Sequence, residues 1–256
     1  MKDFSDILIC SDFDGTLYHG KKQCVSDIDA EAIRYFQEHG GAFTLCSGRL
    51  PFVLEEKGVK NVSLNAPIIS MNGALIYDLQ KNEKLFEDIM HADILEYIFK
   101  ICESTDDVEN LFIPAYDEIK ESPLIPPSDK EKIRSVIEYG AFKTVFRLTP
   151  EKNSDANLEL VKSVMPEKFA VSRSWAFGVE VQNATASKGL SARRVANMLG
   201  RKTLICVGDY ENDISMIKEA DIGYAVANAC EPLKAVADRI TTAKLGGAIA
   251  EIIYSL

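Results

Sequence analysis

The sequence has no excess of basic residues. Its 29 Lys and Arg residues stand against 39 Asp and Glu residues, which gives a formal net charge of −10 over 256 residues. A protein that binds the phosphate backbone of nucleic acids needs a basic face, and no Lys/Arg cluster of that kind occurs in the sequence. We therefore expect no nucleic-acid partner, and an anionic substrate would need local cations or a bound metal ion.

Long apolar runs are also absent. No window approaches the roughly 18 uninterrupted apolar residues of a membrane-spanning helix. The first ten residues, MKDFSDILIC, contain acids where a secretory signal peptide has a basic region and a long apolar core. We therefore expect no membrane partner and a cytoplasmic protein.

Cysteine pairs with the spacing of metal or redox motifs are absent as well. None of the six cysteines falls in a CxxC pair, and three of them, Cys10, Cys46 and Cys206, end apolar runs. A free thiol behaves as a small apolar side chain and is among the most buried side chains in proteins. The sequence thus predicts buried, reduced cysteines with no metal or redox role.

Short apolar runs and helical patterns alternate at both ends of the chain. Runs of the kind found in strands buried on both faces occur at Ile7–Cys10, Ala42–Cys46, Pro67–Ser70, Thr203–Val207 and Ile222–Val226. Helical patterns occur at Ser26–His39, which opens with Ser26 and Asp29 in a capping arrangement, and at Leu190–Leu199 and Ile214–Ala220. This alternation predicts an α/β fold: a doubly wound parallel-sheet core of the Rossmann-like kind, with helices on both faces.

The middle of the chain breaks this alternation. It predicts a hairpin through Lys81 and Asn82, a helix at His91–Glu103, a strand at Leu111–Tyr116 and a loop with Pro123, Pro126 and Pro127. A helix opening at Ser128 with Glu131 as its capping partner, a strand at Phe142–Leu148, a helix at Asp155–Met165 and strands through Lys168–Val181 follow. In the last strand Phe177, Val179 and Val181 alternate with polar residues, which predicts a sheet with one solvent-exposed face. We expect an inserted α+β domain over residues 80–184, between the two parts of a core domain, 1–79 and 185–256.

Two concentrations of carboxylates follow predicted strands. Asp12 and Asp14 follow the first strand, and Asp209 and Asp213 follow the run TLICV. Ligands of open parallel sheets bind beyond the carboxyl ends of the strands, so these acids should arrive at one edge. Converging carboxylates repel one another unless a cation holds them, and oxygen-only donors favour Mg²⁺. Taken singly, each acid could instead form a turn or cap a helix.

Further polar residues complete this constellation. Ser47, Gly48 and Arg49 end the run AFTLC and offer a hydroxyl and backbone N–H groups that suit phosphate oxygens. Lys188 stands at a predicted helix start, where a cation opposes the helix dipole, so an anion beside it is expected; a solvated surface lysine is the alternative. Asn72 and Gly73 could line the site or simply turn the chain.

The motifs DFDGT, SGR, the lone Lys188 and GDYENDISMIKEADIGYAVANA, in this order, resemble the four motifs of the haloacid dehalogenase superfamily. The insert between the second and third motifs is similar to that of the Cof-type subgroup, which carries a large α/β cap there. The only departures are small: Phe13 stands where leucine is commoner, and Ser47 where threonine is commoner. Both keep the apolar or hydroxyl character of the position.

The resemblance implies a role for each matching residue. Asp12 would be the nucleophile that forms an aspartyl-phosphate, and Asp14 would be the general acid and then the general base. Mg²⁺ would be held by the side chains of Asp12 and Asp209 and by the backbone carbonyl of Asp14. The remaining roles are those of Asp213 as a further ligand or orienting group, Ser47, Gly48 and Lys188 as phosphate-binding residues, and Asn212 as a phosphate contact or a support for Lys188.

The resemblance thus implies a Mg²⁺-dependent phosphatase that acts on a small phosphorylated metabolite, such as a sugar phosphate or a nucleotide or cofactor phosphate. A sugar phosphomutase of the same superfamily is the first alternative, and a non-catalytic phosphometabolite-binding protein is the second. Nothing in the sequence indicates the oligomeric state. Candidates for contacting the leaving group are Arg147, Arg173, Trp175, Glu180 and Gln182. Simple packing is the favoured interpretation for Trp175, and a solvated face is the favoured interpretation for the two arginines.

Overall fold

The computed structural model describes residues 2–18, 25–57, 61–114, 124–149, 154–243 and 246–256. The chain divides into two compact units: residues 1–86 with 187–256, and residues 87–186. The first boundary falls later than residue 80 because β5 (Glu83–Glu87) belongs to a sheet with β3 (Ile68–Ser70) and β4 (Leu75–Asp78). The hairpin predicted through Lys81 and Asn82 is confirmed, and Asn82 has a positive φ of 55°.

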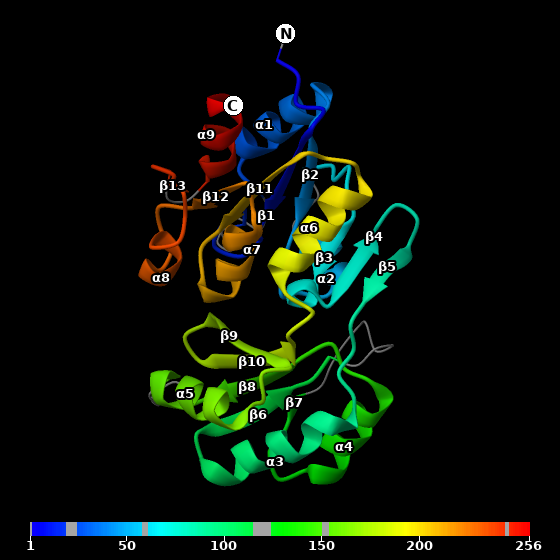
Figure 1. Ribbon diagram of the computed structural model, residues 1–256, viewed down its shortest axis with the longest axis vertical. Helices are drawn as coiled ribbons and strands as arrows, with labels where there is room; N and C mark the ends of the chain where they lie inside the picture. The colour runs from blue at the N-terminus through cyan, green and yellow to red at the C-terminus, as the bar shows by residue number, and fades with distance from the viewer. Residues whose placement is uncertain (1, 19–24, 58–60, 115–123, 150–153, 244–245) are drawn as a thin grey trace. The chain divides into compact units, whose positions relative to one another are not determined.

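A five-stranded parallel sheet forms the centre of the first unit (Figure 1). Its order is β13 (Arg239–Ile240), β12 (Ile222–Ala225), β11 (Thr203–Gly208), β1 (Ile7–Ser11) and β2 (Ala42–Leu45). In the register, Cys10 of β1 lies between Cys206 of β11 and Thr44 of β2. The predicted parallel core sheet is confirmed, whereas the exposed two-residue strand β13 has no apolar run that could have predicted it.

Four helices of the first unit pack in two pairs. Helix α1 (Asp27–Glu38) packs against α9 (Ala248–Ser255), and α6 (Lys188–Met198) packs against α7 (Ile214–Glu219) and β11. The predicted cap of α1 is confirmed, because Ser26 Oγ accepts a hydrogen bond from the Asp29 amide. The short helices α2 (Pro51–Lys57) and α8 (Glu231–Lys234) were not predicted.

The second unit is an antiparallel sheet covered by helices on one face (Figure 1). The strand order is β7 (Leu124–Ile125), β6 (Val108–Phe112), β8 (Thr144–Leu148), β10 (Gly178–Asn183) and β9 (Phe169–Trp175). Apolar side chains from these strands form one core with α3 (Leu95–Ser104), α4 (Lys130–Tyr139) and α5 (Ser154–Val164).

Three local predictions for the second unit were wrong in detail. Strand β6 begins at Val108 rather than Leu111, and residues 115 and 116 of the predicted strand lie outside the described residues. Strand β7 lies within the predicted Pro-rich loop. Helix α4 is capped by Asp129, whose side chain accepts from the Lys132 amide, and not by Ser128.

The predicted solvent-exposed face of the last strand is also wrong. Val179 and Val181 belong to the core as expected, but Glu180 is buried as well and forms an ion pair with Lys143 at 3.1 Å. Phe177 lies before β10 and is 37% exposed. The sequence around Glu180 does not reveal its burial because its partner Lys143 lies 37 residues away, just before β8.

The predicted burial is confirmed for three of the described thiols. Cys10, Cys46 and Cys206 are free and buried, and burial raises the pKa of Cys10 and of Cys46 well above the ordinary thiol value. Cys102 and Cys230 are free but half-buried, and Cys24 lies outside the described residues. Among the helices of the described ranges, none has both the length and the apolar character to cross a membrane.

Substitution of Asp29 by alanine should destabilise the protein. The buried Asp29 carboxylate accepts from the Gly247 amide at 2.7 Å and the Ala250 amide at 2.9 Å, so it joins α1 to the start of α9. Losing these charge-assisted bonds and leaving their donors unpaired should lower the free energy of unfolding by about 2–4 kcal/mol, measured by urea denaturation. The exposed neighbour Asp27 is the control, for which Asp27→Ala should change it by less than about 1 kcal/mol; equal effects would contradict the assignment.

Candidate active site

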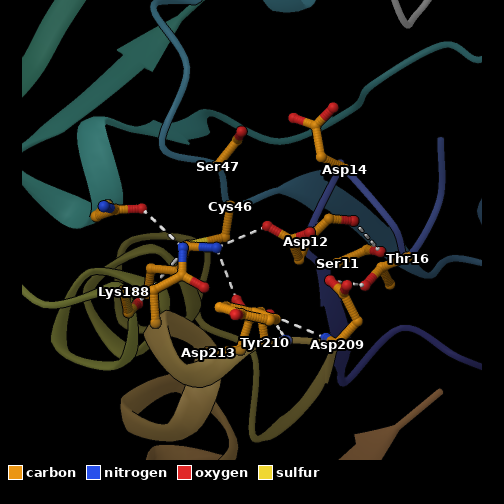
Figure 2. Close-up of polar contacts among 12 residues, drawn as sticks. Ser11, Asp12, Asp14, Thr16, Cys46, Ser47, Lys188, Asp209, Tyr210 and Asp213 are labelled. Atoms are coloured by element: carbon orange, nitrogen blue, oxygen red, sulfur yellow. Dashed lines mark hydrogen bonds and ion pairs between the residues drawn. The ribbon is translucent and has the colours of Figure 1, made fainter. Parts of the chain in front are cut away.

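Three carboxylates meet at the carboxyl ends of β1 and β11 (Figure 2). Asp12 directly follows β1, and its amide donates to the carbonyl of Val207 at 2.8 Å, which extends the strand pairing by one residue. Asp209 directly follows β11, and Asp213 ends the short 3-10 helix Glu211–Asp213 that comes next. One ligand oxygen from each of the three acids lies within 4.8 Å of the others. The convergence that the strand pattern predicted is present for these three residues.

Asp213 performs two tasks with its two oxygens. Its Oδ2 accepts from the amides of Asp209 and Tyr210 at 2.9 and 3.1 Å, which fixes the turn. Its Oδ1 accepts from Lys188 at 2.6 Å. Asp213 can therefore both fix the local backbone and bind Lys188 in the site, because a carboxylate has enough lone pairs for both.

Lys188 is a buried residue of the site and not a solvated surface residue. Ser187 caps α6 by accepting from the Leu190 amide, so Lys188 is the first helical residue. Its ammonium donates to Asp12 Oδ1 and Asp213 Oδ1, both at 2.6 Å (Figure 2). A buried cation at the positive end of a helix is unfavourable, so the two carboxylates must offset its burial.

The site holds more negative than positive charge. Burial by itself would lower the pKa of Lys188, but the charges of Asp12 and Asp213 outweigh burial and hold the pKa well above its ordinary value. Burial raises the pKa of Asp12 strongly against the opposing effect of Lys188. Burial and the charge of Asp213 raise the pKa of Asp209 to about 6. With only one ammonium beside them, bonded to two of the three, these acids keep an affinity for further positive charge.

This donor set fits a divalent hard cation. The candidate ligand atoms of Asp12, Asp209 and Asp213 are all carboxylate oxygens, the type that Mg²⁺ prefers. The Thr16 hydroxyl donates to Asp209 Oδ1 at 3.0 Å and thereby orients one of these acids. Sequence reasoning missed Thr16, although the DGT part of the first motif contains it.

The side chain of Asp14 is not part of the carboxylate cluster. Figure 2 shows its carboxylate directed away from Asp12, and the side chain is 46% exposed. Arg49 binds it with two donors, Nε to Oδ2 at 2.5 Å and Nη2 to Oδ1 at 2.7 Å. The predicted acid and base role of Asp14 and its backbone contribution to a metal site therefore stay predictions.

The predicted phosphate-binding residues lie on neighbouring segments. Ser47 is buried one residue beyond Cys46, and its Oγ accepts from the Arg49 amide at 3.2 Å; Gly48 between them is half-buried. The side-chain Nδ2 of Asn212 donates to Asn72 Oδ1 at 3.3 Å. Asn72 has a positive φ of 54°, so it both turns the chain and contacts a residue of the fourth motif. The phosphate-binding roles remain predictions.

Comparison with known proteins agrees with this fold. The profile of the family described as haloacid dehalogenase-like hydrolase matches residues 9–253. A 5-amino-6-(5-phospho-D-ribitylamino)uracil phosphatase of Bacillus subtilis, YcsE, is 25% identical, over 96% of this chain and 94% of its own. A haloacid dehalogenase-like hydrolase structure from B. subtilis has a TM-score of 0.76 at 22% identity, covering 97% of this chain and 99% of the other.

A third comparison extends the fold likeness to a sugar phosphatase. The structure of the subclass IIB sugar phosphatase BT4131 has a TM-score of 0.72 at 19% identity, and covers 91% of this chain and 92% of that one. With its fold, its carboxylate cluster and its matching profile, this chain belongs to the haloacid dehalogenase-like hydrolases. It is a phosphoric monoester hydrolase of that family.

Substitution of Gly73 by alanine should displace Lys188. A Cβ at Gly73 would lie 2.3 Å from the Ser187 carbonyl oxygen, a backbone atom at the start of α6, and φ at Gly73 is +102°. Because the helix start must shift, we expect the rate of phosphate release to fall about a hundredfold in a steady-state assay.

Gly200, at the other end of α6, provides the control for this prediction. Its φ is +65°, but no atom lies within 4 Å of an added Cβ. Gly200→Ala therefore carries backbone strain of about 1–2 kcal/mol without a clash, and its rate should stay close to that of the parent protein. Equal loss of activity in both variants would mean that strain, and not the position of Lys188, is responsible.

Proposed function

We propose that this protein is a Mg²⁺-dependent phosphatase that hydrolyses a small phosphorylated metabolite through an aspartyl-phosphate on Asp12. The observation that carries the proposal is the buried Lys188 ammonium between Asp12 and Asp213, beside Asp209. The ammonium supplies a fixed positive charge where a phosphoryl group would gather negative charge. The surplus of carboxylates supplies both a nucleophile and a place for a cation.

Each half of the reaction uses residues of the first unit. A carboxylate oxygen of Asp12 attacks phosphorus, the bond from phosphorus to the ester oxygen breaks, and Asp14 gives its proton to that oxygen. In the second half, Asp14 takes a proton from a water molecule as that water attacks phosphorus and the bond to Asp12 breaks. Lys188 and the Ser47 hydroxyl bind the phosphoryl oxygens, with Gly48 and Asn212 beside them.

Asp12, Asp209, Asp213 and the backbone carbonyl of Asp14 would hold the Mg²⁺ ion. When bound, Mg²⁺ supplies positive charge that lets the carboxylates and the phosphoryl group approach one another. Without such a cation, the negative charge of Asp12 would be repelled by those of Asp209 and Asp213, and burial makes this repulsion more costly.

The substrate is proposed to be a sugar phosphate or a related nucleotide or cofactor phosphate. The relative YcsE is named for a phosphoribitylamino-uracil, and the structural neighbour BT4131 is named a sugar phosphatase; both names refer to small phosphorylated metabolites. We propose that residues 87–186 form the cap that selects the leaving group. Their antiparallel sheet and its three-helix cover would supply a surface separate from the phosphoryl-transfer residues.

The direct test is release of inorganic phosphate from a panel of sugar phosphates, nucleotides and cofactor phosphates, with Mg²⁺ and with chelator. We expect release that requires Mg²⁺ and that Asp12→Asn abolishes without loss of the fold. Turnover by the Asp12→Asn variant would contradict the proposal. Phosphate that moves within a sugar without release would favour a mutase, and tight binding without any reaction would favour a binding protein.

Replacing Asp209 by asparagine should raise the Mg²⁺ concentration that the enzyme needs. The substitution keeps the size of the side chain but removes one negative charge from the carboxylate cluster. We expect the Mg²⁺ concentration at half-maximal rate to rise about tenfold or more, as measured by titration of Mg²⁺ at saturating substrate. Glu231→Gln, at a side chain that is 87% exposed, should leave this concentration unchanged. If both variants behave alike, Asp209 is no ligand.

A further inference from the structure

One ion pair at the site has no place in the reaction described above. Arg49, the last residue of the SGR motif, binds both carboxylate oxygens of Asp14, at 2.5 Å through Nε and at 2.7 Å through Nη2. The two residues are 35 positions apart and follow different strands, β1 and β2. The pair therefore forms only in the folded protein.

Exposed ion pairs as a class contribute little to stability, so exposure by itself would argue against a role. This pair differs in its geometry, because a planar guanidinium that binds both carboxylate oxygens fixes the direction of the carboxylate as well as its distance. A single ammonium contact would leave the carboxylate free to turn.

Arg49 itself is held at several points. Its amide donates to Ser47 Oγ at 3.2 Å, and its carbonyl accepts from the buried Ser70 hydroxyl at 2.5 Å. Its guanidinium carbon lies 5.9 Å from the centre of the Phe13 ring. The anchored backbone and the packed ring limit where the guanidinium can lie.

The segment that carries Asp14 is fixed as well. Gly15 N donates to the Tyr18 carbonyl at 3.0 Å, and Tyr18 N donates to the Phe13 carbonyl at 2.7 Å. The rings of Phe13 and Tyr18 stack at 4.8 Å. With its backbone fixed, the remaining freedom of Asp14 is rotation of its side chain, and the Arg49 guanidinium removes that freedom.

We propose that Arg49 is a positioning residue that orients the Asp14 carboxyl group for proton transfer to the leaving oxygen and, in the second half of the reaction, from the attacking water. The inference rests on the proposed function, in which Asp14 is the acid and then the base. Arg49 acts through Asp14 and not on the phosphoryl group, so it should matter only where the proton of Asp14 is needed. An unoriented aspartate reaches the leaving oxygen in only a fraction of its rotamers.

Leaving groups of different acidity separate this role from a general structural one. An alkyl phosphate needs a proton on its leaving oxygen as the bond to phosphorus breaks, whereas p-nitrophenyl phosphate leaves as a stable anion without one. In single-turnover assays that follow release of the leaving group, and not of phosphate, we expect Arg49→Ala to slow the alkyl substrate about 10- to 100-fold, within the range of general acid catalysis. The rate for p-nitrophenyl phosphate should change by less than about threefold, and Arg49→Lys, which keeps the charge but not the fork, should fall between.

A double-mutant cycle with Asp14→Asn tests whether Arg49 acts through Asp14. If it does, Arg49→Ala should cost nothing further in the Asp14→Asn protein, because the group that it positions is already gone. Unfolding in urea checks that each variant keeps the parent stability, which we expect for a pair at the surface.

Different outcomes overturn different parts of the account. Equal slowing of both substrates by Arg49→Ala, no slowing of either, or a further loss in the Asp14→Asn protein would overturn the proposal for Arg49 alone. If Asp14→Asn slows alkyl and aryl substrates equally, Asp14 is not the acid, and the proton-transfer part of the proposed function fails together with the role of Arg49. Abolished turnover in Asp12→Asn would still support the nucleophile in that case.

Discussion

The buried ammonium of Lys188 is the interaction on which the site depends. It joins Asp12, 176 residues away in the sequence, to Asp213, 25 residues away. An unpaired charge at this depth would be strongly destabilising, so both acids and the start of α6 must be placed together when the first unit folds. The close approach of Gly189 to the Ser215 carbonyl, where a Cβ would lie 2.2 Å from the oxygen, lets α6 reach this position beside α7.

The same interaction explains why the site favours phosphoryl chemistry. One ammonium does not balance three carboxylates, of which two are buried and Asp209 is half-buried, so the cluster favours added positive charge. A metal ion bound there would in turn favour an anionic substrate. The parallel sheet brings these groups together because β1 and β11 are neighbours whose carboxyl ends share one edge. Both the folding of this edge and its chemistry therefore require that the negative charge of the carboxylates be compensated.

The strand pattern predicted where Asp12, Asp209 and Asp213 would converge, because apolar runs and chain direction determine which residues reach the edge of a parallel sheet. It could not predict the direction of the Asp14 side chain, which depends on rotation about single bonds and on Arg49 in a distant segment. In the second unit, Ser128 and Asp129 can both cap a helix, so the sequence allows either start. The burial of Glu180 depends on Lys143, just before the neighbouring strand β8, and no local sequence pattern indicates this pairing.

The central claim is that Asp12 becomes covalently phosphorylated, and chemical trapping tests it most directly. Enzyme turning over a substrate would be quenched in acid and reduced with borohydride, which converts an aspartyl-phosphate to homoserine, and peptide mass spectrometry would locate the product. The account predicts homoserine at position 12, dependent on substrate, with Asp14 unmodified. Phosphate release in a single turnover with no modified residue, or with homoserine at another aspartate, would contradict it.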